Sequence, residues 1–287
     1  MKLSGLNAIV TGASQGLGLE IARQFLTEGA NVAICARDGE KLSKAEQELR
    51  AIARSGQKVF ALACDVSAES AVAAFFDSTI RGFGSVHILV NNAGIYGPKG
   101  PTESVDFNEW KRAMEINLYG VLLPCRAVIP HFKSSGHGKI INLSGGGATA
   151  PMPLISAYAA SKAAVVRLTE TLAEELRSFH VDVNAVAPGA LNTRLLDEVL
   201  EAGPSTVGDA FYQRALKQKE TGGAPIALGA QLCVWLASAE SNGITGKLLS
   251  AQWDPWKSLA SRATELASSD IYTLRRIVPE DRGKKYS

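Results

Sequence analysis

The 287-residue chain lacks the features that mark several common classes of protein. Its formal net charge is only +2, so no overall basic field favours nucleic acid as a partner. No run of about 18 apolar residues could cross a bilayer, and the first residues lack the apolar core of a secretory signal. We therefore expect a cytoplasmic protein that binds neither nucleic acid nor membranes.

Cysteine and histidine are scarce, with four residues of each. The cysteines stand far apart, without CxxC spacing and without the density of a disulfide framework. The histidines form no i,i+4 pair and have no cysteine or carboxylate partner at metal-ligand spacing. The sequence therefore predicts free thiols in a reducing compartment and no bound metal.

The chain does contain a regular alternation of short apolar runs and longer helical patterns. The predicted strands are Ala8–Thr11, Val32–Ala36, Val59–Ala63, Val86–Asn91, Lys139–Leu143, Val181–Ala187 and Lys247–Ser250. The predicted helices lie near Gly16–Glu28, Gly39–Arg54, Ala68–Phe83, Phe107–His131, Ser156–Phe179 and Pro225–Ala237. Near-continuous apolar strands are typical of a parallel sheet buried on both faces. This order predicts an α/β, doubly wound fold with right-handed crossovers.

A glycine-rich turn, residues 11–18, joins the first predicted strand to the first predicted helix. Glycines in such a turn let the backbone approach a pyrophosphate, and the helix N-terminus offers free N–H groups. A tight turn without a ligand is the alternative, but the strand context favours a dinucleotide. The residues expected to contact it are Gly12, Ser14, Gln15, Gly16, Leu17 and Gly18.

The residues after the second predicted strand bear on the choice of dinucleotide. An acidic residue here would bind the ribose hydroxyls of NAD and repel a 2′-phosphate, but position 36 is alanine. Arg37 follows and could pair with a phosphate through its planar guanidinium. Asp38 could reach the ribose or simply cap the next helix. We therefore predict NADP, with NAD as the alternative.

Tyr158 and Lys162 are four residues apart, on one face of a predicted helix. A nearby ammonium favours the phenolate and should draw the tyrosine pKa down from about 10. Such a phenol can exchange a proton with a carbonyl or carbinol oxygen. Alone, the pair is more often part of an ordinary amphipathic helix, so its meaning depends on the other motifs.

Taken together, these motifs resemble the short-chain dehydrogenases/reductases from Lys2 to about Ala251. The matching segments are Thr-Gly-x-x-x-Gly-x-Gly (11–18), Cys-Asp-Val (64–66), Asn-Asn-Ala-Gly (91–94), Asn117, Tyr158/Lys162 and Val-Ala-Pro-Gly (186–189). The resemblance implies a Rossmann-type sheet of order 3-2-1-4-5-6-7 and hydride transfer between a nicotinamide and an alcohol or ketone. It also implies a homodimer or homotetramer built through the long helices.

The resemblance implies roles for individual residues. Tyr158 would be the acid/base, Lys162 would hold the nicotinamide ribose, and Asn117 would help hold a water that links Lys162 to solvent. The further cofactor contacts would be Asp65 at the adenine with Val66, Asn91 near the ribose with Ala93 and Gly94, and Pro188, Gly189 and Thr193 around the nicotinamide. Each has an alternative: Asp65 a helix cap, Asn117 a satisfied core residue, and Pro188-Gly189 a turn.

One position departs from the family's pattern. The family places a serine thirteen residues before the tyrosine, where this chain has Gly145, and the neighbouring serine is Ser144. Successive strand side chains point to opposite faces, so Ser144 should point away from Tyr158 unless Gly145–Gly147 form a bulge. We predict that Ser144 substitutes. The alternatives are an active site without serine, and a protein that binds cofactor without turnover.

Two segments fall outside the family's usual outline. Residues 191–223 occupy the place of a substrate lid, or are a surface loop. Residues 252–287 form an extension that carries Trp253, Trp256 and the Arg275-Arg276 pair. We expect it to pack on the domain or on a neighbouring subunit. Its arginines would face an anionic group at the substrate entrance, or surface acids in an arm that stabilises an oligomer.

The sequence thus predicts a single Rossmann-type domain over residues 1–251 that interconverts a secondary alcohol and a ketone with NADP(H). The substrate would be a polar, sugar-like or anionic small molecule. A non-catalytic NADP(H)-binding sensor or scaffold is the alternative that Gly145 suggests. An epimerase or dehydratase of nucleotide sugars is a further one, although those enzymes favour a Gly-x-x-Gly-x-x-Gly turn.

Overall fold

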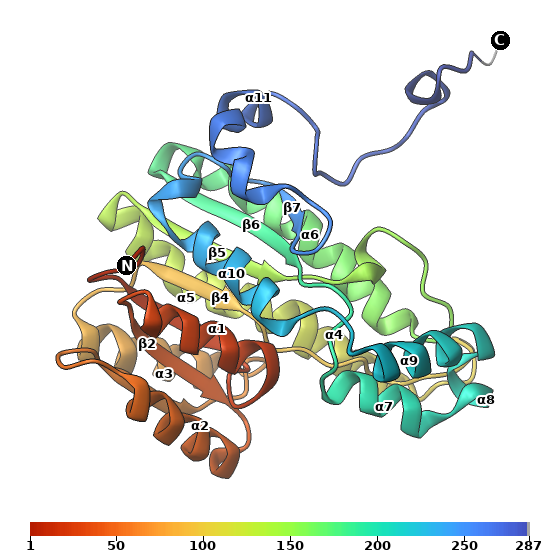
Figure 1. Ribbon diagram of the computed structural model, residues 1–287, viewed down its shortest axis with the longest axis horizontal. Coiled ribbons are helices and arrows are strands. Elements are labelled where there is room, and N and C mark those ends of the chain that lie inside the picture. Colours follow the sequence, from red (N-terminus) through yellow and green to blue (C-terminus); the bar gives the residue numbers. More distant parts are fainter. Residues whose placement is uncertain (286–287) are drawn as a thin grey trace.

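A computed structural model describes residues 1–285 of the chain. Within these residues seven strands form one parallel sheet in the order β3-β2-β1-β4-β5-β6-β7, which confirms the predicted topology (Figure 1). The strands are β1 (Asn7–Thr11), β2 (Asn31–Ala36), β3 (Val59–Ala63), β4 (Ile88–Asn91), β5 (Gly138–Leu143), β6 (Val181–Ala187) and β7 (Leu248–Ser250). Strand order reverses between β1 and β4, so a crevice is expected at their carboxyl ends.

Helices cover both faces of the sheet. One face carries α1 (Gly16–Thr27), α2 (Gly39–Ile52) and α10 (Ile226–Ala237), and the other α3 (Glu69–Phe83), α5 (Gly120–Ser135) and α6 (Ser156–Leu176). Alternate residues of each strand enter the two cores, as with Val10 on one side of β1 and Ile9 on the other. In the part of the chain that the structure describes, no helix is long and apolar enough to cross a bilayer.

The long helix predicted at 107–131 is interrupted in the structure. It consists of α4 (Phe107–Met114), a π-helical turn (Glu115–Tyr119) and α5. Such π-turns often mark functional sites, because the extra residue redirects side chains from their usual helical positions. Here the π-turn carries Asn117, which is fully buried.

Residues 191–223 form three short helices that we call the lid. They are α7 (Arg194–Ala202), α8 (Pro204–Val207) and α9 (Asp209–Thr221), gathered at one end of the molecule in Figure 1. Gly203 (φ 73°) and Gly208 (φ 81°) make the turns between them in a backbone conformation that favours glycine. The lid helices bury a small apolar cluster of their own around Leu196 and Val199.

The C-terminal extension begins as part of the main core. Trp256 is 5% exposed, packs against Trp235 of α10 and donates its indole N–H to the Ala251 carbonyl at 3.1 Å. Leu259, in a 3₁₀ segment (Trp256–Arg262), and Leu266, in α11 (Ala263–Ala267), are buried in the same core. This part of the extension is therefore folded onto its own domain.

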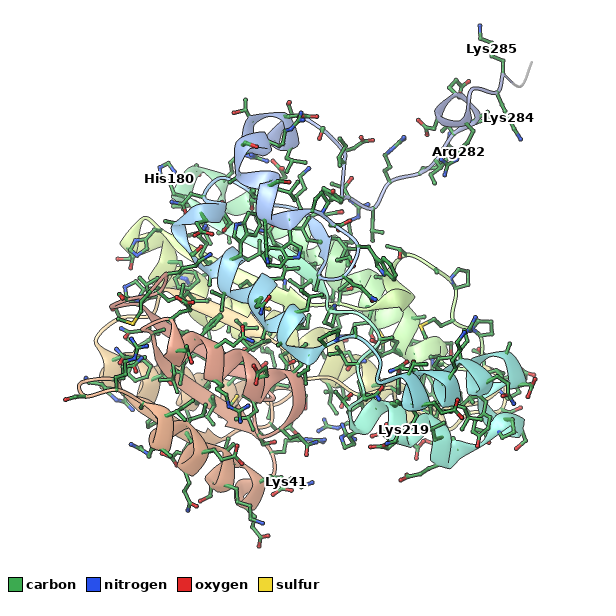
Figure 2. All side chains as sticks on the ribbon, in the orientation of Figure 1. Lys41, His180, Lys219, Arg282, Lys284 and Lys285 are labelled. Carbon is green, nitrogen blue, oxygen red and sulfur yellow. The ribbon has the colours of Figure 1, made fainter. Side chains whose placement is uncertain are left out.

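The extension continues along the edge of the sheet and then leaves it. The Tyr272 carbonyl accepts the N–H of Leu248 at 2.8 Å, which occupies an otherwise open group of the edge strand β7. The last described residues form an arm with a 3₁₀ turn (Pro279–Arg282), and this arm lies apart from the body in Figure 1. Figure 2 shows Arg282, Lys284 and Lys285 on this arm, apart from the other side chains.

Replacing Trp256 with alanine should lower the free energy of unfolding by about 3–5 kcal/mol, because a buried indole leaves the core. Trp253→Ala is the matched control: this side chain is 78% exposed, and its loss should change stability by no more than about 0.5 kcal/mol. Urea unfolding followed by circular dichroism measures both. Equal effects of the two variants would contradict the assignment of Trp256 to the core.

Candidate active site

A cavity of about 1870 Å³ opens at the carboxyl ends of the strands and extends under the lid. Pockets for drug-sized ligands occupy about 300–1,000 Å³, so this cavity has room for a dinucleotide and a second small molecule. The predicted residues that line it are Gly12, Ser14, Gln15, Gly16, Leu17, Arg37, Asp65, Val66, Ala93, Gly94, Ser144, Tyr158, Lys162, Pro188, Gly189 and Thr193. Gly18, Asn91 and Asn117 are not on its wall.

The glycine turn after β1, which we call the glycine cradle, leaves no room for side chains at two of its glycines. A Cβ on Gly12 would lie 2.7 Å from the Ala93 Cα, and a Cβ on Gly18 would lie 2.4 Å from the Asn92 Nδ2. Gly18 therefore permits close packing between α1 and the loop after β4, while its contact with a cofactor stays a prediction. The N-terminus of α1 has no acidic residue in its first turn, so its N–H groups and dipole suit an anion such as a pyrophosphate.

Asn92 connects the loop after β4 to the glycine turn after β1, a role that was not predicted from the sequence. Its Nδ2 donates to the carbonyls of Thr11 and Gly12, each at 3.0 Å. Its backbone N–H donates to the Thr11 hydroxyl at 3.1 Å. These contacts identify Asn92 as a residue that positions the glycine turn. Its place as the second asparagine of the Asn-Asn-Ala-Gly motif could have indicated it.

The side chain of Asn91 points away from the cavity, and the predicted contact of this residue near the cofactor ribose stays a prediction. It is 1% exposed, and its Nδ2 donates to Asn142 Oδ1 at 2.9 Å. Alternation along β4 is the reason: Asn91 shares a face with Leu89, which is buried in the core beneath α3, α5 and α6. Asn91 therefore braces β4 against β5 from inside the sheet.

The end of β2 presents two cations to the cavity. Asp38 Oδ1 accepts the N–H of Lys41 at 3.0 Å, so Asp38 caps α2, one of the two roles left open by its sequence position. This hydrogen bond holds the pKa of Asp38 below its usual range. Arg37 and Lys41 both line the cavity, and within residues 1–285 the Arg37 guanidinium forms no ion pair.

Asp65 is a carboxylate held on the wall by its neighbours. Its Oδ1 accepts hydrogen bonds from the N–H and hydroxyl of Ser67 at 3.0 and 2.6 Å, and its Oδ2 pairs with Arg112. Burial raises the pKa of Asp65, but these bonds outweigh it, so the pKa lies below its usual range. The residue at the N-cap of α3 is Ala68, so Asp65 does not cap that helix.

Tyr158 and Lys162 lie one turn apart on α6, and both are almost completely buried beside the cavity. Lys162 Nζ donates to the Leu143 carbonyl at 2.8 Å and lies 5.7 Å from the centroid of the Tyr158 ring. Burial lowers the pKa of Lys162 to about 8. Burial, with a smaller contribution from Tyr96, raises the pKa of Tyr158 above its ordinary value.

These directions correct the prediction that Lys162 draws the Tyr158 pKa down. Desolvation penalises the charged form of each group, and here it exceeds the attraction between ammonium and phenolate. The phenol is therefore held in its protonated form, as a proton donor aimed at the cavity.

Asn117 lies behind the cavity wall, where the π-turn directs its side chain inward. Its Oδ1 accepts the Ile95 N–H and its Nδ2 donates to the Ile95 carbonyl, both at 2.9 Å. Nδ2 also donates to Ser161 Oγ on α6 at 2.9 Å. Asn117 thus holds the loop after β4 against α6, while its contact with a water stays a prediction.

Gly145 directly faces the tyrosine. A Cβ at this position would lie 2.3 Å from the Tyr158 Oη, so the phenol occupies the space that a side chain would need. The Gly145 backbone is fully extended (φ 179°, ψ 177°), and no bulge reverses the alternation of side chains. Ser144 consequently points away, with its Oγ buried and without a hydrogen-bond partner in the described residues. This arrangement contradicts the prediction that Ser144 replaces the missing hydroxyl.

The lid is joined to the loop after β4 across the substrate end of the cavity. Lys99 Nζ lies 3.6 Å from a carboxylate oxygen of Glu198 on α7, and Arg194 pairs with the same carboxylate. The rings of Tyr96 and Tyr158 meet edge to face at this end, 4.7 Å apart between centroids. No sequence pattern places this loop residue against α6, so Tyr96 was not among the predicted site residues.

Comparison with known proteins supports the resemblance seen in the motifs. A family model described as short chain dehydrogenase matches residues 6–203. The chain is 40% identical over 248 residues to 3beta-hydroxysteroid dehydrogenase 1 of Eggerthella lenta, covering 86% of this chain and 92% of the relative.

Solved structures agree with this relationship. NAD⁺-bound xylitol dehydrogenase superposes with a TM-score of 0.78 at 29% identity, covering 87% of this chain and 98% of that one. A gluconate 5-dehydrogenase from Burkholderia cenocepacia, in complex with NADP and tartrate, gives a TM-score of 0.76 at 30% identity, covering 87% and 94%.

Adding one carbon at position 145 should disturb the tyrosine. We expect Gly145→Ala to shift the Tyr158 hydroxyl and to cost about 1–3 kcal/mol of stability, as overpacking in a filled site does. Gly146→Ala is the matched control, because nothing lies within 4 Å of a Cβ there. Crystal structures and unfolding curves of both variants test this. An unmoved Tyr158 with unchanged stability in Gly145→Ala would contradict the close approach described above.

Proposed function

The chain belongs to the short-chain dehydrogenase family, and on that premise we propose that it interconverts a secondary alcohol and a ketone with NADP(H). Family membership makes it an NAD(P)-dependent oxidoreductase, while the choice of NADP and of a polar substrate is the proposed part. The observation that carries the proposal is that Tyr158 and Lys162, one turn apart on α6, line the same cavity as the glycine turn after β1.

The residues present fit a nicotinamide dinucleotide. The bound nicotinamide supplies or accepts the hydride at its C4 carbon. The glycine turn and the N-terminus of α1 would hold the pyrophosphate, and Lys162 would donate to the nicotinamide ribose. In ketone reduction Tyr158 gives its proton to the carbonyl oxygen, and the neighbouring Lys162 stabilises the phenolate that remains.

The end of β2 supports NADP over NAD. Position 36 is alanine, so no carboxylate there would repel a 2′-phosphate. The Asp38 carboxylate is engaged in capping α2 and in an ion pair with Lys41 at 3.6 Å. Arg37 and Lys41 provide two positive charges on the cavity wall for the extra phosphate.

The lid supports a polar substrate that carries an anionic group. Arg214 and Lys217 on α9 line the cavity, and neither forms an ion pair in the part of the chain that the structure describes. A carboxylate or phosphate on a sugar-like substrate would pair with them. The gluconate dehydrogenase relative, whose structure contains tartrate, is consistent with this chemistry.

We also infer a homodimer or homotetramer. Phe107 of α4 is 67% exposed and Tyr119 of the π-turn is 50% exposed, so two large apolar side chains stand on the outer side of these helices. A second copy of the chain would cover them.

The function is tested by mixing the purified protein with NADPH and a panel of polar ketones while following the absorbance of reduced nicotinamide. The wild type should oxidise NADPH with at least one ketone. Tyr158→Phe should lower kcat by about 10²–10⁴-fold, because it removes the proton donor, and should leave the Kd for NADPH unchanged. Tight NADPH binding without oxidation across the panel would instead favour the sensor or scaffold. Isomerisation with an unchanged cofactor spectrum would favour the epimerase.

Cofactor choice is tested at Arg37. Arg37→Ala should weaken NADPH binding by about 1.5–3 kcal/mol, roughly tenfold or more, since a charge-assisted hydrogen bond to the 2′-phosphate is lost. The Kd for NADH should stay the same. Arg50→Ala on the outer face of α2, where Arg50 pairs with Glu46, is the matched control and should change neither Kd. Equal weakening of both cofactors by Arg37→Ala would contradict the assignment.

A further inference from the structure

The site described above leaves the reacting oxygen with only one assigned hydrogen-bond donor, Tyr158. Position 145 has no side chain, and the Ser144 Oγ is buried away from the cavity. Loss of one such donor typically costs about 10²–10³ in kcat. An efficient enzyme therefore needs another donor close to the Tyr158 hydroxyl.

Tyr96 is the residue placed to be this donor. Its ring packs edge to face against Tyr158, with centroids 4.7 Å apart and planes at 64°, and it lines the same cavity. Within residues 1–285 neither phenol forms a side-chain hydrogen bond, and neither oxygen is among the fully buried polar atoms that lack a partner. Both hydroxyls thus keep some exposure in residues that line the cavity, whereas the Ser144 hydroxyl is completely buried.

Contacts with Asn117 on one side and with the lid on the other fix the position of Tyr96. Asn117 binds the N–H and the carbonyl of the preceding residue, Ile95, which ties the loop to α6. On the lid side the Tyr96 ring packs against the apolar cluster around Leu196, and Lys99 Nζ lies 5.9 Å from its centroid. A donor held in place in this way needs little reorganisation when charge develops on a substrate oxygen.

The charge state of Tyr96 also suits a donor. Burial, followed by the nearby Glu198 carboxylate, raises the pKa of Tyr96 above its ordinary value. The phenol therefore keeps its proton throughout the physiological pH range.

Resting on the function proposed above, we propose that Tyr96 is a second catalytic phenol, which donates a hydrogen bond to the same oxygen that Tyr158 protonates. In ketone reduction the carbonyl carbon receives the hydride, and the electron pair of the C=O π bond moves to oxygen. That oxygen takes the proton of Tyr158, and the resulting phenolate regains a proton from solvent. Tyr96 keeps its own proton and stabilises the negative charge as it forms.

This role explains why position 145 is glycine in a site that still keeps Tyr158 and Lys162. With no side chain at 145, Tyr158 Oη sits against the Gly145 backbone and its ring meets that of Tyr96. A side chain at 145 would push the Tyr158 hydroxyl away from its present position relative to Tyr96. The absence of a serine at position 145 and the packing of Tyr96 against Tyr158 therefore belong to the same arrangement.

The test is Tyr96→Phe, which keeps the ring and its packing but removes the hydroxyl. It uses the panel ketone that the wild type turns over best, with saturating NADPH. We expect kcat to fall by about 10²–10³-fold, with the Kd for NADPH unchanged. The kinetic isotope effect with NADPH deuterated at the transferred position should also increase, because hydride transfer becomes slower relative to binding and release. Tyr272→Phe removes the hydroxyl of a tyrosine that lies outside the cavity, and this matched control should behave as the wild type.

Three results would overturn the proposal. A kcat within threefold of the wild type in Tyr96→Phe would show that its hydroxyl is not a donor. A raised KM with unchanged kcat and isotope effect would reduce Tyr96 to a residue that packs the lid. Loss of kcat in Ser144→Ala, with none in Tyr96→Phe, would return the role to Ser144. A wild type without ketone turnover would instead refute the proposed function itself, and the role of Tyr96 with it.

Discussion

The close approach of Tyr158 to the backbone of Gly145 is the constraint on which the rest of the site depends. The phenolic oxygen occupies the volume of a side chain at position 145, where a Cβ would lie only 2.3 Å from it. The extended Gly145 backbone then directs the preceding serine away from the cavity. Because this contact uses the space in which the family places its serine hydroxyl, any second donor to the reacting oxygen has to come from another element.

Burial dominates the electrostatics of this site. Tyr158 and Lys162 are both removed from water, so burial raises the pKa of the phenol above its ordinary value and lowers the pKa of the ammonium to about 8. A neutral phenol is the form required to donate a proton to a ketone. At the other end of the cavity, Arg37 and Lys41 line the wall, where an anionic group could pair with them. One cavity thus has a protonated acid at its substrate end and a cationic surface at its β2 end.

The fold was predictable because its signals are local and repeated. Each apolar run became a strand with bounds shifted by two residues at most, as with Val86–Asn91, which starts at Ile88 in the structure. The direction of the Asn91 side chain was also predictable, because Asn91 lies two residues after the apolar Leu89 on the same strand and so points to the same face. The pKa of Tyr158 was not predictable, because the sequence shows the lysine four residues away but not how deeply both groups are buried. Tyr96 was missed for a similar reason: its contact with α6 joins segments 62 residues apart.

The loop after β4 connects the glycine turn to the lid. Asn92 fixes its beginning to the glycine turn, and Asn117 fixes Ile95 to α6, so this part belongs to the cofactor cradle. Lys99 then pairs with Glu198 of the lid, the region where short helices replace the regular alternation of the sheet. Tyr96 lies between these two anchors. Any movement of the lid around a substrate would therefore displace Tyr96 directly and Tyr158 only through Tyr96. The same side chain would thus contact the lid that binds the substrate and polarise the substrate oxygen.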